Sequence, residues 1–240
     1  RRAAEGEELQ QVVNPDGSVL EEKIDEMYVL SSGKVWLSTF GHELLVVHTD
    51  AETHALSFEK FSYPGKKQQG RNTYQVVEDS QKTTWILSDG GLCAIDSLGK
   101  SVCYFESLPV YSMVENTRRI VFGAKDQLIL YDKQNMNFMQ AQLPVSGNVR
   151  LINAVGAGKY VFTIEGKGFM TYDAAREEWK HYSTATHPQM KTDEIRHIYL
   201  DRSEEVWMGI ADAGVLHFLP QSGQLEYVET AVNEGQIINP

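Results

Sequence analysis

Short apolar stretches separated by polar turns recur along the whole chain, and five of them align on one pattern. Each starts around an apolar anchor residue, continues through a polar turn that often holds glycine, and ends in a second apolar stretch. The anchors, spaced 49, 36, 40 and 46 residues apart, are Trp36, Trp85, Val121, Val161 and Trp207. Self-similarity at periods of roughly 20–50 residues is typical of repeat architectures, so this repetition is the first constraint on the fold.

An apolar stretch and a polar turn also precede each anchor, and a more polar stretch closes each unit, as "MYVLSSGK" and "ALSFEKF" do around Trp36. Val, Ile, Tyr, Phe and Trp favour strands here, and no segment shows an apolar stripe at helical spacing. The pattern predicts an all-β fold, a β-propeller made of about five four-stranded antiparallel blades. A β-sandwich is the weaker interpretation, because its strands lack such self-similarity.

The predicted blades span residues 22–63, 72–107, 109–144, 148–184 and 193–230, and residues 1–21 read as the outer strand of a preceding or closing blade. Five blades could close a ring, with this first strand sealing the last blade. Alternatively, they could form an open arc whose edges another chain or further blades would cover. Blades stacked face to face bury both faces of each sheet, so the anchor tryptophans are interpreted as packing residues.

Composition limits the partners. The 240 residues carry a formal net charge of −11 at 42% hydrophobic content, which argues against a nucleic-acid backbone or an anionic lipid surface as partner. No run approaches the roughly 18 apolar residues of a membrane span. Two cysteines, Cys93 and Cys103, flank a predicted hairpin and would lie opposite each other. A disulfide in an oxidising compartment and two buried free thiols both remain open.

The repeats resemble those of the two-component regulator propeller family. The segment "YLDRSEEVWMGIADAGVLHF" fits best, and "VVEDSQKTTWILSDGGLCAID" also fits well. The third and fourth units replace tryptophan with valine at the anchor. The resemblance implies the periplasmic sensor region of a bacterial hybrid two-component system, in which a carbohydrate fragment is sensed. It also implies a membrane-anchored full-length protein with a histidine kinase, of which this chain would be a fragment.

The turns between the second and third strands of each blade are expected on one face, where their side chains would converge. Their polar residues suit hydrogen bonding to a polyhydroxylated or anionic small molecule, although turns are polar simply because they are exposed. The candidate ligand-binding residues are His42, Glu43, Asp89, Lys125, Asp126, Glu165, Lys167 and Asp212. A long connection, Phe61 to Tyr74, adds Lys66, Lys67 and Arg71 as a second candidate for contact with an anion or a partner.

Arg118 and Arg119 fall in a turn on the opposite face and are expected to be solvated. No motif for catalysis, a metal or a cofactor is found: the seven histidines are scattered, without zinc-site spacing. The leading hypothesis is therefore a non-catalytic, ligand-sensing domain that could form a homodimer. An enzyme acting on a small cyclic substrate, a lyase or hydrolase with His42 and Glu43 as its pair, is one alternative. A protein-interaction scaffold is the other.

Overall fold

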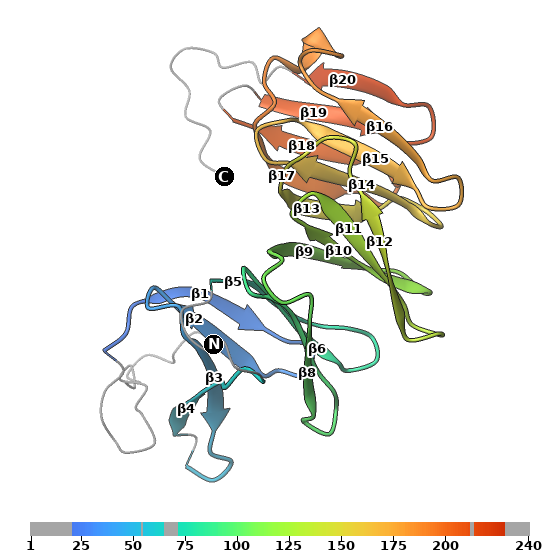
Figure 1. Ribbon diagram of the computed structural model, residues 1–240. Helices are drawn as coiled ribbons and strands as arrows, with labels where there is room; N and C mark the ends of the chain where they lie inside the picture. The colour runs from blue at the N-terminus through green and yellow to red at the C-terminus, as the bar shows by residue number, and fades with distance from the viewer. Residues whose placement is uncertain (1–20, 54, 65–71, 212–213, 229–240) are drawn as a thin grey trace, which may run out of the picture. The chain divides into compact units, whose positions relative to one another are not determined.

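The structure is a computed structural model that describes residues 21–53, 55–64, 72–211 and 214–228. Within these residues, twenty strands form five four-stranded antiparallel sheets, each made of four consecutive strands (Figure 1). A short 3₁₀ helix, Pro188–Met190, is the only helical element of this part of the chain. The prediction of an all-β chain of four-stranded antiparallel blades is confirmed. The predicted outer strand in residues 1–21 lies almost wholly outside the described residues.

The chain divides into two compact units, residues 1–110 and 111–240. The first unit holds two sheets. The first sheet consists of β1 (Ile24–Val29), β2 (Val35–Thr39), β3 (Leu44–Thr49) and β4 (Leu56–Lys60). The second sheet consists of β5 (Thr73–Glu78), β6 (Thr84–Ser88), β7 (Gly91–Ile95) and β8 (Ser101–Tyr104).

The second unit holds three sheets. The third sheet consists of β9 (Val110–Glu115), β10 (Arg119–Ala124), β11 (Gln127–Asp132) and β12 (Asn137–Gln142). The fourth consists of β13 (Val149–Ala154), β14 (Lys159–Ile164), β15 (Phe169–Asp173) and β16 (Glu178–Tyr182). The fifth consists of β17 (Ile195–Leu200), β18 (Val206–Ile210), β19 (Gly214–Leu219) and β20 (Gln224–Val228).

The hydrophobic core lies between neighbouring sheets of each unit. In the fourth sheet, Tyr160 and Phe162 pack toward Val121 of the third sheet, whereas Val161 packs toward Met208 of the fifth. Successive residues of a strand point to opposite faces, so Tyr160, Val161 and Phe162 of the inner strand β14 are all apolar because both of its faces are covered. In the first unit, the anchor Trp36 likewise packs in a cluster with residues of the second sheet.

The outer strands are more polar, as the repeat pattern predicts. In β20, Gln224 and Glu226 are exposed while Leu225 and Tyr227 pack against the core. This alternation of exposed polar and packed apolar residues is typical of a strand with one covered and one solvated face. The apolar central strands and the half-polar outer strands together explain why the fourth stretch of each repeat is the least hydrophobic.

An aspartate locks the turn before the anchor in the second and fifth sheets. Asp79 accepts hydrogen bonds from Gln81 N–H and Thr83 N–H, both at 2.9 Å, and from Trp85 Nε1 at 2.8 Å. Asp201 accepts the same three, from Ser203 N–H at 2.8 Å, Glu205 N–H at 3.0 Å and Trp207 Nε1 at 2.9 Å. The anchor tryptophan is therefore joined to its own sheet by its indole N–H as well as by packing.

The first sheet lacks this aspartate, and Leu30 occupies the equivalent position. The backbone turn is retained, since Leu30 N–H donates to Lys34 O at 2.9 Å and Gly33 N–H donates to Leu30 O at 2.9 Å. However, the Nε1 of the buried Trp36 has no hydrogen-bond partner among the described residues. Burying a donor without an acceptor is unfavourable, so this repeat retains the packing function of the tryptophan and has lost its polar anchor.

A disulfide joins the hairpin of β7 and β8. Cys93 and Cys103 are directly opposite in the register, their Cα atoms are 4.0 Å apart and their sulfurs are bonded. Cys93 is buried in the core of the first unit. The bond therefore fixes the outermost strand of the second sheet to the strand that contributes to the core.

A charged cluster joins the turns of the first two sheets. The Ser31 hydroxyl and the Lys82 ammonium both donate to the Glu78 carboxylate, the latter at 2.9 Å. These two hydrogen bonds, with Ser31 making the larger contribution, lower the pKa of Glu78 to about 2. The carboxylate is therefore held in its charged form, and it connects the β1–β2 turn to the end of β5.

Candidate functional site

Asp126 ties the β10–β11 turn to the connection between β12 and β13. Its backbone is left-handed, with φ of 62°, and its N–H donates to Gly147 O at 2.9 Å. Its carboxylate accepts from the Ser146 hydroxyl and from Gly147 N–H, both at 2.7 Å. The hydrogen bond from Ser146 is the main cause that holds the pKa of Asp126 below its usual range. A negative charge is thus fixed in place on the turn.

Two predicted lysines gather around this charge. Lys167, in the β14–β15 turn, donates from Nζ to Ser146 O at 2.6 Å. The positive charges of Lys125 and Lys167 also help to lower the pKa of Asp126. We call Lys125, Asp126, Ser146 and Lys167 the Ser146 cluster. Asp126 and Lys167, predicted from two separate turns, therefore come together in the second unit because both bind a serine that the sequence pattern did not single out. Lys125 adjoins them as the sequence neighbour of Asp126.

Glu165 extends the same surface. Its carboxylate accepts from Asn148 Nδ2 at 2.8 Å and lies 3.7 Å from the Nε of Arg150. Asn148 follows directly on the segment that binds Asp126, so Glu165 borders the Ser146 cluster. The surface offers fixed charges of both signs beside exposed hydroxyl, amide and ammonium donors. Such groups can hydrogen-bond a polar small molecule without carrying out chemistry on it.

The predicted residues of the first unit are held in separate contacts. His42 is exposed and left-handed, with φ of 62°. The Glu43 carboxylate forms an ion pair with Lys60, and Asp89 accepts from Asn72 Nδ2 at 3.2 Å. Within the described residues, no hydrogen bond or ion pair links Asp89 to either of the other two candidates.

Several candidates fall outside the described residues. These are Asp212 in the β18–β19 turn, and Lys66, Lys67 and Arg71 in the long connection. The described ends of that connection are anchored, because the hydroxyl of the buried Tyr63 and that of Thr73 lie 3.1 Å apart in a hydrogen bond. A basic contact surface on this connection stays a prediction.

The acidic and histidine side chains of the described residues do not gather into a metal centre. No group of three or more His, Cys, Asp and Glu side chains there could hold a metal ion. The described histidines are dispersed: His217 binds Glu205 at 2.7 Å, and His48 lies 3.5 Å from Glu59. No helix of this part of the chain has the length and apolar composition to cross a membrane.

The opposite ends of the strands carry a feature that sequence reasoning missed. Arg118 and Arg119 were expected to be solvated, and Arg118 is exposed, with its Nε donating to Asp132 at 3.2 Å. Arg119 instead is half-buried, and its Nε is fully buried. Adjacent arginines in a turn have the same appearance in sequence whether or not the next sheet covers one of them. The pattern therefore held no signal for this difference.

Comparisons with known proteins bear on the fold. No family model matches the chain, and neither does any curated protein. Solved structures do match. One is the extracellular domain of BT4673 from B. thetaiotaomicron, described as a one-component system, with a TM-score of 0.64 and 15% identity over 87% of this chain. A second structure of the BT4673 extracellular domain, described as a hybrid two-component system, matches with a TM-score of 0.62 and 18% identity over 87% of this chain.

The extracellular domain of BT3049 from B. thetaiotaomicron, described as a hybrid two-component system, matches with a TM-score of 0.62 and 14% identity over 92% of this chain. The chain spans about a third of these solved structures, at 31%, 30% and 31% of their respective lengths. At such identities the likeness concerns the fold. The chain is folded like part of the extracellular domain of a hybrid two-component system.

Proposed function

We propose that this chain is a ligand-sensing part of the periplasmic region of a two-component regulator, and that it binds a small polar ligand, a carbohydrate fragment, at the Ser146 cluster. The observation that carries the proposal is the convergence of Asp126 and Lys167 on Ser146, with Lys125 next to Asp126, at a turn surface built from two neighbouring sheets. The fold shared with extracellular sensor domains supports it. The disulfide also suits an oxidising compartment.

The role of the chain in this proposal is binding rather than catalysis. A ligand that contacts both the β10–β11 and the β14–β15 turns would favour one arrangement of the two sheets that carry them. Signalling then follows as a population shift, whose size is set by the difference in affinity of the ligand for the two arrangements. Contacts with other domains of a membrane-anchored receptor, or with a second copy, would transmit that shift.

Calorimetric titration of the whole chain with a panel of neutral oligosaccharides tests the proposal. We expect saturable binding to at least one sugar. Asp126→Asn and Lys167→Met should each weaken it at least about tenfold, since each removes a charge-assisted hydrogen bond. Lys100→Met, a matched change on an exposed lysine of the β7–β8 turn, should leave it unchanged.

The proposal fails if none of the neutral sugars binds. It also fails if binding is insensitive to both cluster variants. Circular dichroism of each variant establishes that its sheets are intact before its affinity is compared with that of the parent chain.

A further inference from the structure

A cleft opens in the second unit at the strand ends opposite the Ser146 cluster, and its volume is about 720 Å³. It lies where the β9–β10 turn meets the turns of the next two sheets, β13–β14 and β17–β18. Asn116, Arg118, Arg119, Gly156, Tyr160 and Glu204 are among the residues that line it. We call this the Arg119 cleft. Its volume is within the usual range of small-molecule sites, roughly 300–1,000 Å³.

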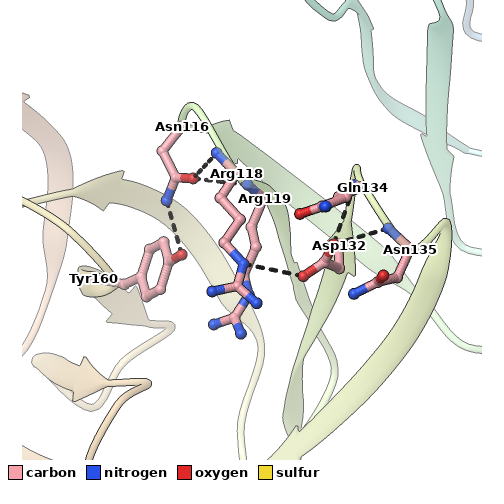
Figure 2. Close-up of polar contacts among 7 residues, drawn as sticks. All are labelled: Asn116, Arg118, Arg119, Asp132, Gln134, Asn135 and Tyr160. Atoms are coloured by element: carbon pink, nitrogen blue, oxygen red, sulfur yellow. Dashed lines mark hydrogen bonds and ion pairs between the residues drawn. The ribbon is translucent and has the colours of Figure 1, made fainter.

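Arg118, the first of its two arginines, has its partner within the protein. The Nε of Arg118 donates to Asp132 Oδ2 at 3.2 Å. The other oxygen of Asp132 accepts from the backbone N–H groups of Gln134 and Asn135, at 3.1 and 3.0 Å (Figure 2). Both oxygens of this carboxylate are therefore engaged. Asp132 neutralises Arg118 and leaves no counter-charge for a second arginine.

Arg119 is the arginine left over. Its backbone lies opposite that of Asp132 in the β10–β11 register. Within the described residues, however, its side chain forms no ion pair, and its buried Nε has no acceptor. Burying part of a guanidinium without an acceptor is unfavourable. The chain has 33 acidic residues against 22 basic ones, so carboxylates are abundant in the sequence. Among the described residues, however, none of them forms an ion pair with Arg119.

The wall beside Arg119 is ordered by hydrogen bonds. Asn116 Oδ1 accepts from the backbone N–H groups of Arg118 and Arg119, at 3.0 and 2.8 Å. Its Nδ2 donates to the hydroxyl of Tyr160 at 3.0 Å (Figure 2). Burial raises the pKa of Tyr160, so its hydroxyl keeps its proton. Tyr160 is itself buried, so its hydrogen bond holds Asn116, and with it the β9–β10 turn that carries Arg119, in place.

The far side of the cleft is open and carries one acid. Gly158 has φ of +77° with no atom within 4 Å of where a Cβ would stand, and a Cβ on Gly156 would lie 3.9 Å from a carboxylate oxygen of Glu204. Among the lining residues Glu204 is the one carboxylate. Its oxygens can accept from hydroxyl or amine donors of a bound molecule, at a distance from the cationic end.

We propose that the Arg119 cleft binds a small hydroxylated molecule that carries one oxyanion group. The oxyanion would lie on the Arg119 guanidinium, and the hydroxyl groups would face Glu204. Guanidinium groups suit carboxylate, phosphate and sulfate alike through their planar array of donors. This site lies at the other strand ends from the Ser146 cluster and goes beyond the neutral-ligand function proposed above.

Calorimetric titration of the whole chain with D-glucuronate, glucose 6-phosphate, glucose 6-sulfate and glucose tests the inference and separates the three oxyanions. At least one anionic sugar should bind about tenfold or more tightly than glucose. Arg119→Met should remove this preference, and Arg119→Lys should retain only part of it because the planar donor array is lost. Arg196→Met, at an exposed arginine outside the cleft, is the matched control and should leave it intact.

Thermal unfolding without ligand provides a readout that a structural arginine would not give. Because the side chain of Arg119 has no acceptor among the described residues, Arg119→Met should unfold at the same temperature as the parent chain or higher. Glu204→Gln, a change on an exposed residue, keeps an acceptor oxygen but removes a like charge. It should tighten binding of the anionic sugar about twofold, and less at high salt.

The inference is wrong if every anionic sugar binds no better than glucose, or if Arg119→Met leaves the preference for the anion unchanged. A lower unfolding temperature of Arg119→Met, together with no response to Glu204→Gln, would assign the arginine a structural role instead. The two proposals fail separately. Neutral oligosaccharide binding that depends on Asp126, without anion binding, overturns only this inference, and the reverse result overturns only the Ser146 proposal.

Discussion

The aspartate–tryptophan hydrogen bond of the repeat occurs twice in nearly the same geometry but at different depths, which makes its energetic contribution measurable. Asp79 and Trp85 are each 3% exposed, whereas Asp201 and Trp207 are half-buried. In both pairs the carboxylate accepts two backbone N–H groups and one indole N–H, at 2.8–3.0 Å. Burial is therefore the main difference between the two pairs.

Asp79→Ala should lower the free energy of unfolding by about 3 kcal/mol. A buried donor deprived of its acceptor costs about 1–3 kcal/mol, and a hydrogen bond to a charged group contributes about 1.5–3 kcal/mol. The Trp85 indole N–H would incur the cost of a buried donor without an acceptor, because little water reaches it. Asp201→Ala breaks the same bonds, but water can replace the carboxylate at a half-buried site, so its effect should be distinctly smaller.

Urea denaturation of the whole chain, followed by circular dichroism and by tryptophan fluorescence, measures both variants on the same scale. The urea concentration at the midpoint of unfolding should fall much further for Asp79→Ala than for Asp201→Ala. The slope of the unfolding free energy against urea concentration should stay unchanged. Equal losses in the two variants would show that burial does not set the cost. A loss below about 0.5 kcal/mol for Asp79→Ala, within the range of ordinary surface changes, would refute the assigned role of the hydrogen bond.

Three further outcomes are expected. Reducing the disulfide between Cys93 and Cys103, which lie 10 residues apart, should lower the urea midpoint by the equivalent of about 3 kcal/mol on a chain-entropy basis, and alanine at both positions should make the midpoint insensitive to reductant. The folded-state pKa of Glu78, about 2, is below its ordinary value of 4.5; the stabilisation is therefore complete above pH 4.5 and lost as the pH falls toward 2, so Glu78→Gln should flatten the fall in melting temperature across that window. Gly168→Ala should destabilise the chain by at least about 2 kcal/mol more than Gly158→Ala in urea titrations. Both glycines have φ of +77°, but only a Cβ on Gly168 would meet a backbone oxygen, at 2.2 Å. Equal losses of stability in the two variants would show that left-handed backbone strain is the whole effect.

The repeat pattern was sufficient to predict the fold class. Strands with one solvated face alternate apolar and polar residues, and strands covered on both faces are apolar throughout, so the burial of each strand is visible in its sequence. The "IVFGA" stretch of β10, which is buried throughout, and the "QLEYV" stretch of β20 show the two cases. Five copies in register then indicated the sheets and their order, because consecutive strands that share short turns pair with one another.

The candidate site was predictable only in part. The turn lengths indicated that Lys125, Asp126 and Lys167 belong to turns at one end of the strands, but Ser146, which binds Asp126 and Lys167, lies in a connection between sheets. A hydrogen bond across 20 residues, from Ser146 to Asp126, depends on how two sheets stack, and no local preference encodes it. The same holds for Glu43, whose sequence neighbour is His42 but whose partner in space is Lys60.

The sequence by itself therefore determined the elements: the strands, their grouping in fours and the turns between them, because hydrophobic periodicity and turn chemistry are local properties. Tertiary structure decided which polar groups are satisfied. Asn116 accepts hydrogen bonds from the backbone N–H groups of Arg118 and Arg119, and Asp132 accepts one from the Arg118 side chain. Trp36 and Arg119 each keep a buried side-chain donor that has no acceptor in the part of the chain that the structure describes. Burial by a neighbouring sheet turns an ordinary turn residue into an unpaired charge, and that burial exists only once the sheets have stacked.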